Sequence, residues 1–513
     1  MVAGDAGAAG GGADAGVAQG GSDGGGVAQG ASDGGLSMIP QPAPTLLEAG
    51  ATVIEDVSPD ENSVLVSHQP VNTQPDGLTL VTVGAPPRTL IARSGSWGWF
   101  SPDGRSIVFG AQYGQPGELN LAHSDGSGSR QLTTRSSYPS FAGRWFYYDD
   151  ESGAGVSLYR VLAPDGEPEL IASFQPPQGL SFLPSPDGES VAWCHYLANF
   201  TSECYLRAAG SATPVKIADG LLGTPRWAPD GSFLVGACEI ISLDGSSRRW
   251  CDSAKAGSSS VSNDFRYAVV ALDNGSWPPT QADLEIRLHD FATGATTVVP
   301  TPGPFDGGVF RPSFYVGLTG DGSRLIAELG ASLFTASTSD LRWTEVSATG
   351  ANNSRFSTLA VSPDSRKVAI YGDQGLVESV DGNAPRVVGP PGRSLQYGQR
   401  LRFEPAGGLD KAFFFDAYAN AWLANGDGSG DWLVASGVGD CDWVGRKALC
   451  LRAPAMANPP LPNEVVVVTD TGKAFSTQVE AEAYWRLAAR LTAHKLFYVA
   501  PGGGLYVSDA PAP

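Results

Sequence analysis

Short apolar runs rich in β-branched and aromatic residues recur along the chain, and several follow the same polar phrase. Ser-Pro-Asp-Gly-Arg at 101–105 precedes Ile107-Val108-Phe109, and Ser-Pro-Asp-Gly-Glu at 185–189 precedes Val191-Ala192-Trp193. Proline presets φ at the second position of a turn, aspartate bonds its local backbone, and glycine accepts a positive φ. A turn of this kind between two apolar runs predicts the corner of a β-hairpin.

The phrase returns at a regular spacing of about 42 residues. Variants stand at 58–61, 228–231 and 362–365, and units that lack the phrase are recognised near residues 141, 262, 319, 404, 444 and 489. A repeat of about 40–45 residues that carries four short strands is typical of a propeller blade. We therefore predict an all-β fold, a β-propeller of about eleven four-stranded units. Because single rings usually have about 4–8 blades, both one large ring and two smaller rings with a boundary within 255–318 stay open.

These corner phrases resemble the TolB-like, WD-related β-propeller repeat, and the resemblance covers nearly everything after residue 44. It implies an architecture and no particular activity, because such propellers serve binding proteins and the non-catalytic halves of hydrolases alike. The last unit offers three strands, predicted at 484–487, 495–500 and 504–508. We expect residues 45–48 to pair with 504–508 as its missing outer strand, which would remove exposed sheet edges.

Residues 1–44 have a different composition from the propeller region 45–513. Glycine, alanine, serine and aspartate dominate there, and this composition predicts a disordered tether that buries little surface. The tether resembles those that follow the lipidated cysteine of bacterial lipoproteins, although no apolar signal segment and no cysteine lies near Met1. An in-frame apolar segment encoded upstream of Met1 would decide the compartment.

Charge and hydrophobicity limit the classes of partner. The 513 residues are 42% hydrophobic and 17% charged, with a net charge of −20. This balance argues against nucleic acid or an anionic membrane surface as the main partner, because both require basic patches. No run of eighteen apolar residues occurs, so we expect no transmembrane helix. We also expect a monomer without a cofactor.

The six cysteines form three close pairs along the sequence: Cys194 with Cys204, Cys238 with Cys251, and Cys441 with Cys450. Spacings of this size suit bridges between neighbouring strands of one blade and so favour an oxidising compartment. The alternative is that they are small buried core residues. No Cys-x-x-Cys or clustered Cys/His spacing points to a metal site.

Three other patterns that are associated with catalysis or metal binding have structural explanations. Residues 20–24 and 30–34 match the Gly-x-Ser-x-Gly nucleophile motif but lie in the tether, without the α/β sheet that the motif requires. Residues 425–430 resemble the start of a calcium loop, yet they fit better as a hairpin corner. Lyases of the resembling family gather histidines around a metal, and we expect no such convergence among the five histidines present: His68, His123, His195, His289 and His494.

The loops opposite the Pro-Asp-Gly corners carry aromatic residues in several units. Second-to-third-strand loops contribute Tyr113, Tyr196, Phe200, Trp277 and Tyr418, and between-blade loops add Trp97 and Tyr138. Exposed aromatics often anchor interfaces, although some of these side chains would pack between blades instead. We therefore expect a non-enzymatic propeller of the bacterial cell envelope that binds a protein or glycan partner through this face. The alternatives are a glycan-active hydrolase or lyase with a central-channel site, and a cytoplasmic scaffold.

Overall fold

The computed structural model describes residues 43–510, apart from a set of internal ranges. Those ranges are 52, 69–76, 94, 112–116, 137–138, 152–154, 176–178, 198–201, 220–224, 237, 253–254, 274–283, 303–313, 330–331, 349–358, 363–366, 371–374, 380–385, 389–401, 404–410, 416–420, 426–431, 436–437, 445–446, 453–462, 469–473, 482–488 and 502. Most of the predicted tether, residues 1–42, lies outside the described part. Ser37–Pro513 belong to one compact unit.

All regular elements of the described residues are β-strands, and they form eleven four-stranded antiparallel sheets. In ten sheets the four strands follow one another in chain order, and we call these sheets blades 1–10. Blade 1 comprises β2 (Val53–Val57), β3 (Ser63–His68), β4 (Gly77–Thr82) and β5 (Arg88–Ile91); blade 2, β6 (Ser96–Phe100), β7 (Ser106–Ala111), β8 (Gly117–His123) and β9 (Arg130–Ser136); blade 3, β10 (Ser140–Ala142), β11 (Trp145–Asp150), β12 (Val156–Leu162) and β13 (Glu169–Phe174); blade 4, β14 (Leu180–Pro184), β15 (Val191–Tyr196), β16 (Ser202–Arg207) and β17 (Val215–Asp219).

The remaining blades repeat this pattern. Blade 5 comprises β18 (Arg226–Trp227), β19 (Phe233–Val235), β20 (Glu239–Ser242) and β21 (Ser247–Arg249); blade 6, β22 (Ala256–Val261), β23 (Tyr267–Asp273), β24 (Leu284–Asp290) and β25 (Thr296–Val299); blade 7, β26 (Phe314–Leu318), β27 (Arg324–Leu329), β28 (Ser332–Ser337) and β29 (Trp343–Ala348). Blade 8 comprises β30 (Leu359–Val361), β31 (Lys367–Ile370), β32 (Gly375–Ser379) and β33 (Arg386–Val388); blade 9, β34 (Arg402–Phe403), β35 (Lys411–Phe415), β36 (Ala421–Asn425) and β37 (Trp432–Ala435); blade 10, β38 (Val438–Val444), β39 (Lys447–Arg452), β40 (Asn463–Val468) and β41 (Ala474–Ala481).

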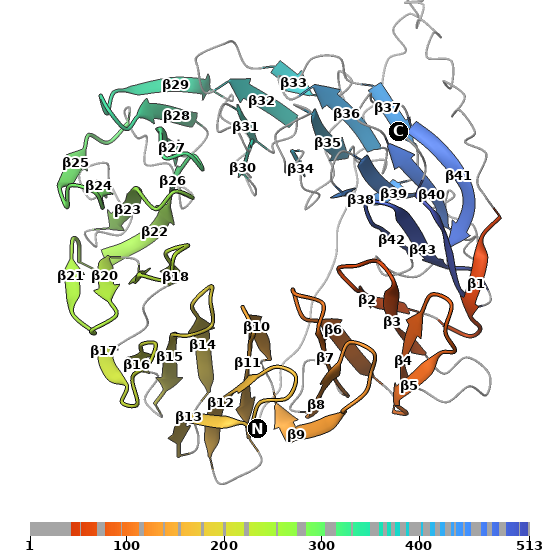
Figure 1. Cartoon of the computed structure of the whole chain (residues 1–513). Helices are drawn as coiled ribbons and strands as arrows, with labels where there is room; N and C mark the ends of the chain where they lie inside the picture. The colour runs from red at the N-terminus through yellow and green to blue at the C-terminus, as the bar shows by residue number, and fades with distance from the viewer. Residues whose placement is uncertain are drawn as a thin grey trace, which may run out of the picture. The chain divides into compact units, whose positions relative to one another are not determined.

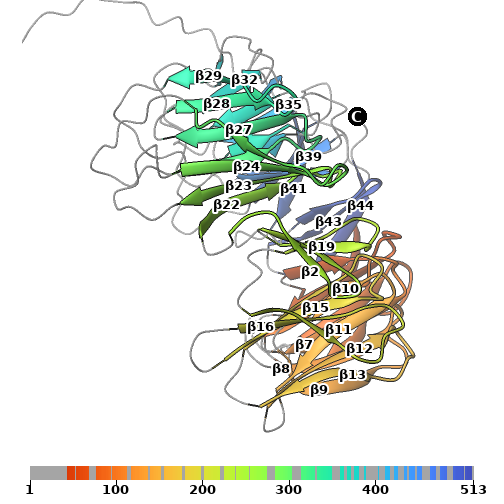
Figure 2. The same ribbon diagram turned by 90° about the vertical axis from the view of Figure 1, so that its left-hand side faces the viewer.

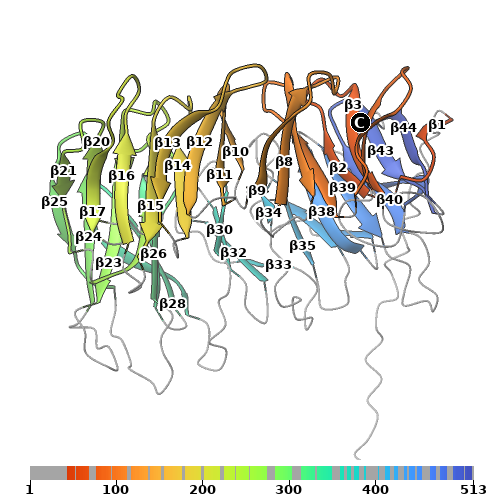
Figure 3. The same cartoon turned by 90° about the horizontal axis from the view of Figure 1, so that it is seen from below.

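Blade 11 is built from both ends of the chain. It comprises β42 (Ala489–Leu491), β43 (Lys495–Val499) and β44 (Leu505–Asp509), and its fourth strand is β1 (Thr45–Glu48). β1 pairs antiparallel with β44, with Thr45 opposite Val507 and Leu46 opposite Tyr506 (Figure 3). The predicted closure is therefore confirmed. The first strand of this blade is β42 and begins at Ala489, whereas the range predicted for it, 484–487, lies outside the described residues.

In the corners of blades 2 and 4, the hydroxyl group of the first residue holds the phrase together. In blade 4, Ser185 Oγ donates to Asp187 Oδ1 and accepts the Ser190 backbone N–H at 2.9 Å. Ser101 makes the same two bonds in blade 2, with Asp103 and with the amide of Ser106. The hydroxyl thus ties the carboxylate to the next strand, which explains why serine and aspartate recur together.

The last position of the corner adopts a left-handed backbone conformation. Gly188 has φ 72°, and a Cβ there would lie 2.1 Å from the Ala142 carbonyl oxygen of blade 3. Glycine therefore allows the corner to approach the neighbouring blade. Glu61 and Phe265 occupy the same position in corners without glycine and keep φ at 59° and 54°.

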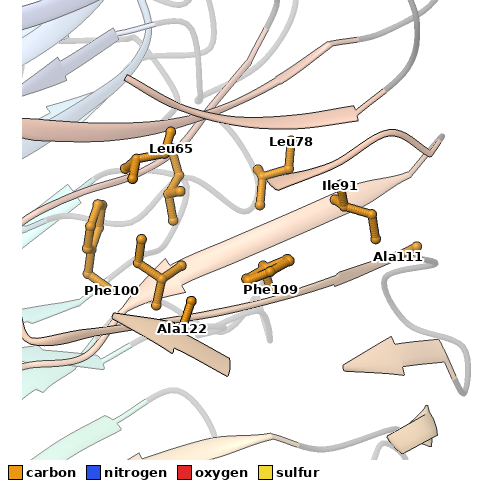
Figure 4. Packing of buried hydrophobic residues seen from close by; sticks show 9 residues of the cluster. Leu65, Leu78, Ile91, Phe100, Phe109, Ala111 and Ala122 are labelled. Carbon is orange, nitrogen blue, oxygen red and sulfur yellow. The ribbon is translucent and has the colours of Figure 1, made fainter. Parts of the chain in front are cut away.

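The hydrophobic cores lie between consecutive sheets. Leu65, Leu78 and Ile91 of blade 1 face Phe100 and Phe109 of blade 2 (Figure 4). Blade 11 packs on blade 1 in the same way, and the first strands of the blades lie toward the middle in Figure 1. Blade 6 contacts blade 7 through β22 and β26, and Figure 2 shows β22–β24 beside β27 and β28. The fold is a multi-blade β-propeller, as predicted.

Three disulfide bonds are present: two join neighbouring strands of one blade, β15 to β16 and β38 to β39, and the third joins the residue before β20 to a residue just after β21. They link Cys194 to Cys204, Cys238 to Cys251, and Cys441 to Cys450, which confirms the predicted pairing. Disulfides of this kind are typical of proteins in an oxidising compartment. Within the described residues, no helix is long and apolar enough to cross a membrane.

Candidate functional site

A β-bulge interrupts β2, the first strand of blade 1, at Glu55. Ile54 pairs with Val66 and Asp56 pairs with Leu65, so Glu55 is an extra residue without a partner on β3. Bulges redirect side chains and are over-represented next to active sites. The Glu55 carboxylate accepts a hydrogen bond from Ser67 Oγ at 2.6 Å. The bulge therefore gives the carboxylate an orientation that regular strand pairing would not provide.

Asp56 lies next to Glu55 and joins two blades. Its Oδ2 accepts the Phe100 backbone N–H of blade 2 at 2.8 Å, and its Oδ1 accepts the Val57 amide at 2.9 Å. In blade 6, Ser260 occupies the equivalent position and accepts the Leu318 amide of blade 7. Asp56 therefore has a structural function that the repeat uses elsewhere. The first strands β22 and β38 also carry bulges, at Gly257 and Gly439, whereas the bulge of β2 carries a carboxyl side chain.

Both carboxyl groups have raised pKa values. Burial is the main cause for Glu55, and the neighbouring Asp56 charge adds to it; the Ser67 hydrogen bond and the positive charge of Arg490 act in the opposite direction. Burial also raises the pKa of Asp56, against the two backbone amides and Arg490. Arg490 lies on β42, and β42 contacts β2. Carboxyl groups with raised pKa values are candidates for proton transfer.

Burial is incomplete at this site, which matters for its chemistry. Glu55, Asp56 and Arg490 are all half-buried. A group of this kind is desolvated enough to hold a proton at a higher pH, yet it keeps access to solvent. Glu55, Asp56 and Arg490 thus place two carboxyl groups and one guanidinium on the first strands of two adjacent blades, and we call these three residues the seam site.

Two of the seven predicted aromatic recognition residues lie in the described part. Tyr196 ends β15 and is 38% exposed, and its ring lies over Gly179. Trp97 lies in strand β6 instead of a loop, and it is buried against Phe146 and Tyr148 of blade 3. The remaining predicted residues lie outside the described part: Tyr113, Tyr138, Phe200, Trp277 and Tyr418.

His195 lies in strand β15. Its ring stacks between Phe174 and Tyr205, and its Nε2 lies 3.5 Å from Glu203 Oε2. Burial lowers its pKa, and the positive charge of Lys216 acts in the same direction against Glu203. His289 is fully buried and stacks on Trp250. Within the described ranges, no three histidine, cysteine, aspartate or glutamate residues are grouped so that they could hold a metal ion.

The sequence reasoning missed the seam site. Glu55 and Asp56 lie in the first unit, whose corner phrase at 58–61 lacks the glycine, and in the sequence they look like ordinary polar positions before that corner. The bulge changes the strand register, and the sequence of β2 gives no sign of it because the strand contains neither glycine nor proline. The one usable signal was two adjacent carboxyl groups on the first strand of a blade.

No family model matches this sequence, and no curated protein matches it. Solved structures with similar folds include the tricorn protease, with 12% identity over 90% of this chain and a TM-score of 0.32. The GH74 xyloglucanase from Xanthomonas campestris has 11% identity over 90% of this chain and 91% of its own, with a TM-score of 0.28. Oligogalacturonate lyase from Vibrio parahaemolyticus has 12% identity over 67% of this chain and 92% of its own, with a TM-score of 0.29.

This chain spans about half of the tricorn protease, 52% of its length. At these identities the likeness is one of fold, which is that of propeller proteins. The prediction of a non-enzymatic protein is nevertheless contradicted, because most of these neighbours are enzymes: peptidases, xyloglucanases and a lyase. We withdraw that prediction, since the aromatic loops on which it rested are equally suited to holding a substrate.

Proposed function

We propose that this protein is a glycan-active enzyme of the bacterial cell envelope, with Glu55 of the seam site as its proton-transferring group. The observation that carries the proposal is the bulge that leaves Glu55 unpaired on the first strand of blade 1, half-buried and with a raised pKa. The three disulfides support an oxidising compartment. The envelope location and the TolB-like character of the repeat are part of the proposal.

The chemistry favoured by these groups is hydrolysis with general-acid assistance. Cleavage of a glycosidic bond requires a proton on the leaving oxygen, and a carboxyl group supplies it best when its pKa is raised toward the working pH. Glu55 meets this requirement, whereas Asp56 is occupied by the Phe100 and Val57 amides. Arg490 offers hydrogen-bond donors to sugar hydroxyl or carboxylate oxygens from the facing strand.

Recognition in this proposal is shared with the aromatic loops. Aromatic rings supply apolar area and often act as anchors of binding surfaces. Tyr196 presents such a ring at the end of β15. The aromatic residues predicted at the same class of loop would extend this surface: Tyr113, Tyr138, Phe200, Trp277 and Tyr418.

The test is an activity screen with matched variants. The oxidised protein is incubated with a panel of neutral and uronic polysaccharides, and released reducing ends and ultraviolet absorbance from unsaturated sugar ends are both measured. We expect reducing ends without the absorbance, a loss of at least about 100-fold in kcat for Glu55→Gln, and unchanged kcat for the control Glu285→Gln. Tyr196→Ala should raise KM and leave kcat near its original value.

Each alternative has its own outcome. Equal turnover by wild type and Glu55→Gln would show that Glu55 is not the acid, and absorbance from unsaturated ends would replace hydrolysis by elimination. Cleavage of no polysaccharide in the panel would refute the proposed function. The pH profile adds a further check, because a general acid must be protonated and kcat should fall as pH rises through the pKa of Glu55.

A further inference from the structure

Strand β1 is the outer strand of blade 11, and within this sheet it pairs with β44 alone. Its residues Thr45, Leu46 and Glu48 are paired with β44, and the register shifts between Leu46 and Glu48. The Leu46 side chain is 51% exposed, whereas Leu47 packs against the core that joins blade 11 to blade 1. The attachment of this strand therefore depends strongly on the groups at its end.

Glu48 ends β1 and its carboxylate is almost buried. The side chain is 11% exposed, Oε1 lies 3.4 Å from His68 Nε2, and Oε2 is buried without a hydrogen-bond partner. An ionised carboxylate in this position carries a large desolvation cost unless a cation or a proton compensates it. Burial accordingly raises the pKa of Glu48, against the charge of His68 and the Ala51 amide.

The hydrogen bonds of His68 determine where its ring carries a proton. Nδ1 lies 3.0 Å from the Gly50 carbonyl oxygen, and Nε2 lies 3.1 Å from Thr79 Oγ1. A carbonyl oxygen can only accept, so Nδ1 bears a hydrogen in either charge state. In the neutral ring, Nε2 then has a lone pair directed at Thr79 and Glu48. One additional proton must lie on Nε2 or on Glu48 for these two groups to attract each other.

Other charged groups around β1 have partners of their own. On β44, Asp509 stands opposite Lys495, and the Tyr506 ring stacks on Tyr498. β4 carries no titratable side chain in its range, Gly77–Thr82. On β2, Glu55 is bonded to Ser67 and Asp56 to the Phe100 amide. Among the described groups, His68 is the one whose charge acts on Glu48.

We propose that Glu48 and His68 form a proton-operated latch that holds β1 in place. With a proton shared between them, the closing strand is attached to blade 1 as well as to β44. When that proton is lost, a buried carboxylate faces a lone pair and the strand is released. A group whose pKa is raised by folding gives stability at low pH that disappears as pH rises through the folded value. The latch is therefore closed in acid and open in alkali.

Hydrogen exchange of the whole oxidised chain tests this latch without any enzymatic assay. Peptides that cover 45–48 and 504–509 are followed from pH 6 to pH 9, and rates are corrected for intrinsic exchange to give protection factors. We expect protection of these peptides to fall at least about tenfold in the wild type, which corresponds to a free energy of opening lower by about 1.4 kcal/mol. Protection of blade 3, which is remote from the latch, should stay constant.

Two variants separate the carboxyl group from the ring. Glu48→Gln cannot ionise, so it should make protection of β1 and β44 independent of pH. His68→Asn keeps a donor for the Gly50 carbonyl but leaves the Glu48 carboxyl group buried without the imidazole, so protection of β1 should lie below that of the wild type at pH 6. An equal fall with pH in Glu48→Gln, wild-type protection in His68→Asn at pH 6, or no fall in the wild type would overturn the latch. A fall shared by blade 3 would also overturn it, because global unfolding would then be the cause. Because the readout is exchange, inactivity toward polysaccharides would leave the result unaffected.

Discussion

Replacing the hydroxyl group of one corner tests the structural explanation of the repeat. Ser185→Ala removes a side chain that is 1% exposed and bonded to both Asp187 and the Ser190 amide. Ser190 is 3% exposed, so its backbone N–H is left buried without that acceptor. An orphaned buried donor costs about 1–3 kcal/mol, and the small cavity left by an oxygen adds little. We expect the free energy of unfolding to fall by about 1–3 kcal/mol.

Blade 5 offers the reverse experiment, because Ala228 occupies the serine position of its corner. Asp230 is held there by Ser232 instead. Ala228→Ser supplies the missing hydroxyl and should stabilise the protein by about 0.5–1.5 kcal/mol, the net value of a typical hydrogen bond. Urea titrations of both variants, with the disulfides kept oxidised, give the two differences. A stability change below about 0.3 kcal/mol for Ser185→Ala would refute the explanation of the corner.

Two more predictions concern the closing strand β1 and an ion cluster between blades 3 and 4. Deleting residues 1–35 should leave the melting temperature unchanged, whereas deleting 1–50 removes β1 and should lower it; equal values would contradict the role of the closing strand. Glu169 accepts hydrogen bonds from Arg160 and Arg207, which outweigh burial and lower its pKa. Glu169→Gln should therefore reduce stability at pH 7 by less than about 1 kcal/mol, because the carboxylate is 38% exposed, and the difference should vanish in acid as the wild-type carboxylate becomes protonated. A loss of the same size at pH 3 and pH 7 would contradict this ion-pair explanation.

The features predicted from the sequence were those in which one residue type has one structural use. The corner phrase has a fixed hydrogen-bond pattern where it begins with serine, and its regular spacing allowed the units that lack it to be recognised and the number of blades to be predicted. The cysteine spacings suited bridges within one blade, and the missing fourth strand of the last unit identified residues 45–48 as the closing strand.

What the sequence could not show depends on register and on contacts between distant segments. The bulge at Glu55 shifts pairing by one residue without a glycine or proline to mark it. The raised pKa values of Glu55 and Glu48 come from burial, and their strands lie against β42 and β44, which are more than 400 residues away in the chain. The short strand β42 has too few residues to show an alternating pattern, which is why its position was missed.

The three disulfides all lie within single blades, and this distribution separates two kinds of stability. Each bridge makes one sheet resistant to local unfolding, whereas contacts between the described blades rest on apolar packing, hydrogen bonds and ion pairs. Oxidation therefore strengthens individual sheets and adds no covalent bond between the described blades. A molecule with all three bridges intact can still separate at the junction of blades 11 and 1, so resistance to reduction and resistance to opening are independent properties of this chain.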